Sequence, residues 1–101
     1  MEVNTLLDSV KRKLNITWED FDTELKLKDM IEDAKIALDY KLGADIDYSQ
    51  NGPEHKLFLN YCLYEWNDCS DEFDNKYMNE IYQIRIKYEV KTYVESENQS
   101  I

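Results

Sequence analysis

The residues best suited to redox or metal chemistry are two cysteines in the stretch LFLNYCLYEWNDC, residues 57–69. On one helix, Cys62 and Cys69 would share a face but lie two turns apart, at about 10 Å. A disulfide needs Cα atoms within about 7 Å, so these thiols are not expected to pair with each other. The sequence has neither a CxxC pair nor a second Cys/His cluster for zinc. We therefore expect both cysteines to be buried, reduced and unreactive.

The stretch DYSQNG, residues 47–52, matches the first half of a calcium-binding loop. Its Asp, Ser and Asn stand at alternate positions and its Gly stands where such a loop turns. Position twelve, which normally carries a bidentate glutamate, is Phe58. We interpret the stretch as a polar turn before a helix.

Catalytic residues are not indicated either. His55 is the only histidine, and no Ser or Cys nucleophile pattern surrounds it. Carboxylates are numerous, but no pair is singled out for acid–base work. The sequence therefore predicts no enzyme activity, no cofactor and no metal site.

The composition limits which classes of protein the chain can belong to. The chain has 101 residues, which suits one domain, and only 2 Gly and 1 Pro, which favours helices over turn-rich β folds. Its formal charge of −10 argues against gripping DNA, because duplex binders neutralise phosphates with a basic face. Neither an export signal nor a membrane span is indicated, so we expect a cytoplasmic protein before any assembly.

Apolar spacing predicts an all-α fold, a small four-helix bundle whose helices cover residues 5–14, 22–42, 53–69 and 74–89. A long polar loop, residues 43–52, joins the second and third helices. Apolar residues surround the third helix, which indicates a central helix packed on several sides. From Ile84 to Val94 apolar and polar residues alternate, so we expect an extended segment after Glu89. The predicted core contains Leu7, Val10, Ile31, Ala34, Leu38, Phe58, Cys62, Trp66, Phe73, Ile81 and Ile84.

The order of these segments resembles a known family. The chain reads LLDSVKRKLNI, then TWEDFDTELKLKDMIEDAKIAL, a polar loop, LFLNYCLYEWNDC and finally FDNKYMNEIYQIRIKYEV. Over roughly residues 5–90 this is similar to the head–tail connector (adaptor) proteins of tailed bacteriophages, also described as putative DNA-packaging proteins. The resemblance has no single diagnostic motif.

The resemblance implies a structural virion protein without catalysis at the head–tail interface. Such adaptors form a ring, with twelvefold symmetry expected, on the phage portal protein. They extend the DNA channel and dock the next stopper or tail-completion protein. The implied organisation is a connector domain, residues 1–90, and an extended or flexible tail, residues 91–101. An acidic channel wall fits this role, because it repels the phosphates of passing DNA.

Two other classes stay open. A small acidic inhibitor could mimic DNA toward a host nuclease, although acids and lysines are mixed along the first two helices. A helix-turn-helix regulator would need a basic, polar recognition helix, and TELKLKDMIEDAK carries four acids and three bases. For a connector, we expect partners to bind apolar residues of the loop and the tail. These candidate partner-binding residues are Ile46, Tyr48, Val90, Tyr93 and Val94.

Overall fold

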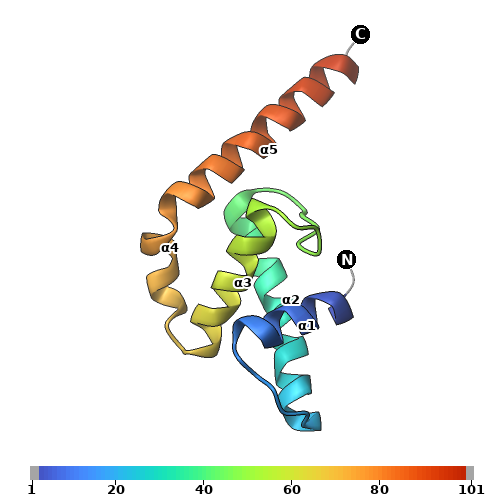
Figure 1. Ribbon diagram of the computed structural model, residues 1–101. Helices are drawn as coiled ribbons and strands as arrows, with labels where there is room; N and C mark the ends of the chain where they lie inside the picture. Colours follow the sequence, from blue (N-terminus) through green and yellow to red (C-terminus); the bar gives the residue numbers. More distant parts are fainter. Residues whose placement is uncertain (1–2, 100–101) are drawn as a thin grey trace.

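The computed structural model describes the backbone of residues 3–99 and the side chains of residues 6–91. Within that range the chain is helical, without a β-strand, so the expected all-α class is confirmed. The elements in order are α1 (Val3–Lys13), α2 (Phe21–Leu42), α3 (Pro53–Trp66), the 3-10 turn η1 (Ser70–Glu72), α4 (Phe73–Lys76) and α5 (Met78–Gln99). In Figure 1, α3 lies at the centre of the helical body, and α5 leaves the body toward the C-terminus.

Helix ends follow from local hydrogen bonding. Asp20 caps α2, because its side chain accepts a hydrogen bond from the Thr23 amide at 3.1 Å. Gly43 ends the same helix in the left-handed conformation, with φ of 71°. Asn15 and Asp68 take this conformation after α1 and α3, and each makes the paired backbone hydrogen bonds of a Schellman motif. Asp68 therefore ends α3 earlier than the predicted boundary at residue 69.

The core forms around α3, which contacts α1, α2 and α5. Its fully buried positions, Leu57, Phe58, Tyr61 and Cys62, lie on one broad face at 100° per residue, and the half-buried Leu59 and Tyr64 extend the packed surface on either side of it. The predicted core residues of α2, Ile31, Ala34 and Leu38, are buried. Leu27 and Leu42 are buried on the same face at helical spacing. Ion pairs join the helices at the rim, with Lys11 Nζ and Glu24 Oε1 2.6 Å apart between α1 and α2.

The prediction that Trp66 lies in the core is wrong. Its side chain is 37% exposed, because it lies at the end of α3 where the chain turns away. Cys69 also lies outside α3 and is half-buried, whereas Cys62 is fully buried. Ile81 is half-buried against the core, and the other predicted core residues are buried.

The fourth predicted helix is broken in two. Tyr77, with φ of −112° and ψ of 21°, separates α4 from α5. The buried Phe73 holds this corner, since its ring meets Tyr61 edge-on at a centroid distance of 4.9 Å and contacts Tyr64 and Tyr77. Such edge-to-face aromatic packing adds to the burial of the rings. The corner lets α5 leave the body in a new direction (Figure 1).

The expected extended segment after Glu89 is wrong, because α5 continues as a helix to Gln99. At 1.5 Å per residue, a helix of 22 residues is about 33 Å long. The described chain is correspondingly elongated, with principal extents of 54 × 28 × 19 Å. Its radius of gyration is 15.1 Å, compared with about 13 Å for a compact domain of this length.

Candidate partner-binding surface

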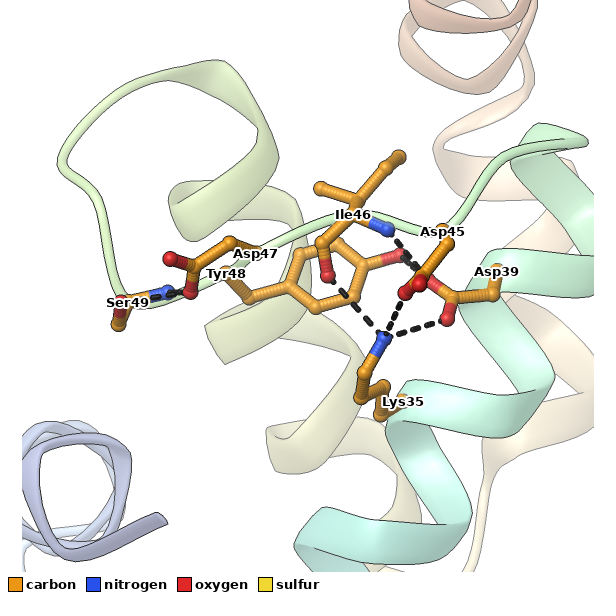
Figure 2. A network of polar contacts seen from close by, with 7 residues as sticks. All are labelled: Lys35, Asp39, Asp45, Ile46, Asp47, Tyr48 and Ser49. Atoms are coloured by element: carbon orange, nitrogen blue, oxygen red, sulfur yellow. Dashed lines mark hydrogen bonds and ion pairs between the residues drawn. The ribbon is translucent and has the colours of Figure 1, made fainter. Parts of the chain in front are cut away.

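The loop between α2 and α3 is fixed by a polar network around Asp39 (Figure 2). Asp39 Oδ1 accepts hydrogen bonds from the Tyr48 hydroxyl at 2.9 Å and from the Ile46 amide at 3.2 Å. Lys35 Nζ lies 2.6 Å from Asp39 Oδ2 and 2.7 Å from Asp45 Oδ1, and donates to the Ile46 carbonyl. Two side chains of α2, Lys35 and Asp39, thus bind the loop at several points and set its path.

The two large apolar residues of this loop lie in the core. Ile46 is almost fully buried, and Tyr48 is fully buried with its ring stacked on Phe58 at a centroid distance of 4.8 Å. Burial and the neighbouring Asp39 carboxylate raise the pKa of Tyr48 well above its ordinary value, so the phenol stays protonated. Ile46 and Tyr48 are therefore not available to a partner in this conformation. The expectation that they form a partner surface is wrong.

The calcium-like stretch closes on itself. Asp47 Oδ1 accepts hydrogen bonds from the Ser49 amide at 3.0 Å and from the Ser49 hydroxyl at 2.6 Å. These hydrogen bonds lower the pKa of Asp47. His55 Nδ1 lies 2.7 Å from the Tyr48 carbonyl and ties the start of α3 to the loop. Among the described side chains, residues 6–91, the structure has no group of three His, Cys, Asp or Glu residues able to hold a metal ion.

The thiols are poorly suited to nucleophilic chemistry at neutral pH. Burial, with a smaller effect of Glu65, raises the pKa of the Cys62 thiol to about 12. The pKa of Cys69 is also raised, by partial burial and by the nearby acids Glu72, Asp71 and Asp68. A thiolate is the reactive form of cysteine, so both thiols react slowly at neutral pH.

A surface of the expected apolar type is present on α5. We call Met78, Tyr82, Ile86 and Val90 the outer stripe of α5. These side chains recur every four residues and are between 40% and 64% exposed. The opposite side of α5 packs on the body through Ile84, with Ile81 and Tyr88 half-buried beside it. Val90 is thus an accessible candidate. Tyr93 and Val94 lie on the helical backbone, but their side chains fall outside the described ones.

The alternation from Ile84 to Val90 has a helical explanation. Ile84 and Tyr88 are four residues apart and face the body, whereas Ile86 and Val90 are four residues apart and face away. Two apolar stripes on opposite faces of one helix are offset by two residues, and together they imitate strand periodicity. The outer stripe was therefore visible in the sequence but was interpreted as one face of a strand.

A groove of about 390 Å³ lies beside this stripe, between α3 and α5. Its floor is apolar, from Leu57 and Ile84, and its rim carries Lys56, Glu80 and Lys87. Lys87 forms an ion pair with Glu54 of α3 at this rim. The groove and the outer stripe together give α5 two apolar surfaces at its junction with the body.

No known protein family, curated protein or solved structure matches the chain. Between residues 3 and 99, none of the helices is both long and apolar enough to cross a membrane. What the protein does must therefore be inferred from its sequence and from the surfaces described above.

Proposed function

We propose that the protein is a non-catalytic structural subunit of the head–tail connector of a tailed bacteriophage. In this role, copies form a ring, with twelvefold symmetry expected, below the portal protein. The ring extends the DNA channel and docks a stopper or tail-completion protein. The protein is then located in the virion at the head–tail interface, after synthesis in the host cytoplasm.

The observation that carries the proposal is the exposed apolar face of the projecting helix α5. About half of this helix runs beyond the body, and its outward face exposes Tyr82, Ile86 and Val90 to solvent. A long exposed apolar stripe on a soluble chain is a common mark of a protein-binding surface. A projecting helix can lie in a groove of another protein, with contacts spaced along one face. The small helical body then acts as the spacer that carries this helix.

Charge supports the same role. The formal charge is −10, and acids remain exposed on the helices. A ring of such subunits would surround DNA with carboxylates and would not hold the phosphates of the duplex. The sequence resemblance to connector proteins, over roughly residues 5–90, is independent of this argument.

The acidic inhibitor is the second candidate. Asp22, Asp29, Glu32 and Asp33 of α2 form no ion pair within the described part of the chain. Unpaired carboxylates along a helix are what a DNA mimic would present. However, the exposed Leu25 and Ile36 lie among them, which suits a protein surface better than a phosphate-like row. Binding to host nucleases, measured in a pull-down, is the test of this alternative.

A particle-joining assay tests the connector proposal. DNA-filled heads that lack this protein are mixed with tails and purified protein, and joined particles are counted by electron microscopy. We expect wild-type protein to restore joining, and a truncation after Glu89 to abolish it while the helical body stays folded. The matched control is Trp18→Gln, which removes an exposed aromatic residue away from α5. Normal joining by the truncated protein would contradict the role given to α5.

A further inference from the structure

The outer face of α2 is the second exposed apolar surface of the chain. Leu25 and Ile36 are 46% and 71% exposed on this face. At 100° per residue, Asp29 and Glu32 fall between them on the same side of the helix, opposite the buried face of α2. We call Leu25, Asp29, Glu32 and Ile36 the outer face of α2. It combines apolar contact area with carboxylates that lack an ion pair in the described residues.

The outer stripe of α5 has the opposite charge at its edges. Arg85 and Lys87 flank Ile86 on either side of the stripe and are 53% and 56% exposed, and each pairs with an acid of its own chain, Glu89 or Glu54. Lys91 follows Val90 in the sequence and, at 100° per residue, lies on another side of α5. Between Met78 and Lys91 these cations outnumber the acids, Glu80 and Glu89, although the whole chain is strongly negative. Both surfaces are therefore helix faces that combine apolar and charged side chains: on α2 the acids lie between Leu25 and Ile36, and on α5 the cations lie beside the apolar stripe. Such complementarity fixes partner and register more than it adds affinity.

We propose that the outer stripe of α5 in one copy binds the outer face of α2 in the next copy. This inference rests on the proposed connector function and names the contact by which copies associate. The two faces are different patches of one chain, so the contact is head-to-tail and leaves one free face at each end of a pair. Contacts of this kind continue from copy to copy and close into a ring when the rotation allows it.

The geometry of α5 suits this contact. Its outward half extends beyond its own body, so it can reach a neighbour without displacing a helix (Figure 1). Ile86 and Val90 lie one turn apart on the outward face, where the helix leaves the body, and the inward residues Ile84 and Tyr88 keep their places in the home core. Pairing basic residues of α5 with acids of α2 also offsets, at the contact itself, the repulsion between two chains of charge −10.

Two surface variants test the contact by mixing. One carries Leu25→Gln with Ile36→Gln on α2, and the other carries Ile86→Gln with Val90→Gln on α5. Circular dichroism first establishes that both have wild-type helicity, as expected for exposed positions. Sedimentation velocity up to about 1 mM, where even weak specific contacts are half-populated, then measures association. We expect wild-type protein to form species larger than a dimer, and each variant alone to stay monomeric.

The equimolar mixture of the two variants is decisive. Each variant keeps the face that the other has lost, so we expect one 1:1 pair and nothing larger. If the α2 variant alone still dimerises, α5 pairs with α5 of another copy and the proposal is wrong. If the mixture stays monomeric, or wild-type protein stays monomeric to the same concentration, the contact is likewise wrong. The connector proposal survives that outcome if the same protein still joins heads to tails.

A third variant changes charge alone and keeps the experiment informative if one of the two glutamine variants unfolds. Asp29→Lys with Glu32→Lys makes the chain less negative, which by itself reduces repulsion between copies. The proposed contact nevertheless requires weaker association, because the new lysines would face the cations of α5. Stronger association of this variant than of wild-type protein would overturn the proposal.

Discussion

Replacing Tyr48 with alanine removes a fully buried ring from the loop between α2 and α3. The ring is stacked on Phe58, and its hydroxyl donates to Asp39 at 2.9 Å. Truncation of a buried aromatic residue to alanine costs about 3–5 kcal/mol of unfolding free energy. For a domain of this length, that loss lowers the melting temperature by at least about 12 °C.

The hydroxyl contribution can be separated from that of the ring. Tyr48→Phe keeps the stacking on Phe58 and removes only the hydrogen bond to Asp39. Hydrogen bonds to charged groups contribute about 1.5–3 kcal/mol. We expect the low end of that range, because the Asp39 side chain is partly exposed and keeps its bonds to Lys35 and the Ile46 amide. Thermal unfolding followed by circular dichroism measures both losses.

Tyr40→Ala is the matched control. Tyr40 is the same residue type, but its side chain is 87% exposed on α2. A surface change of this kind is expected to alter stability by no more than about 0.5 kcal/mol. If Tyr48→Ala melts at the same temperature as Tyr40→Ala, the loop is not packed on its own domain. The exclusion of Ile46 and Tyr48 from the partner surface would then be wrong.

Three further predictions test the packing and the electrostatics of the body. In native protein at pH 8, Cys69 should react with a thiol reagent before Cys62, and both should react in urea. Equal reaction rates of the two thiols in the native protein would contradict the burial of Cys62. Phe73→Ala should lower the free energy of unfolding by about 3–5 kcal/mol and Trp66→Ala by about 2 kcal/mol, because Trp66 is partly exposed. If urea unfolding gives the reverse order, the assigned corner is wrong. The hydrogen bond and charge of Lys11 lower the pKa of Glu24 in the folded protein. The ion pair therefore stabilises the folded state fully above about pH 4.3, the ordinary pKa of Glu, and this stabilisation is lost as the pH falls through the lowered pKa. The melting-temperature difference between wild type and Glu24→Gln should therefore shrink on acidification, and a difference that grows would contradict the ion pair.

The helical class and most of the core were predictable from apolar spacing. The α2 face illustrates why: its buried residues recur three or four residues apart and give a period of 3.6 residues, although Leu25 and Ile36 are apolar on the opposite side. Gly43 and Pro53 marked a helix end and a helix start through their own backbone preferences. The end of α3 was missed because Asp68 takes the left-handed position that glycine more often occupies, and Asp adopts positive φ more readily than most other residues.

The surface predictions depended on tertiary contacts that the sequence does not display. Ile46 and Tyr48 looked unplaced because their anchor, Asp39, lies on α2 and is one acid among many. Val90 is exposed, as a partner-binding residue must be, although its segment is a helix and not a strand. Which face of α5 is outward became clear only when Ile84 was found against the body.

Native mass spectrometry of the protein mixed with the portal ring of the same phage tests the central proposal most directly. Each bound copy adds 12.1 kDa, so the number of copies per portal can be counted. We expect a filled complex with one copy per portal subunit, and loss of that complex when Ile86 and Val90 are replaced by glutamine. A portal ring that binds no copies of the wild-type protein would contradict the connector function.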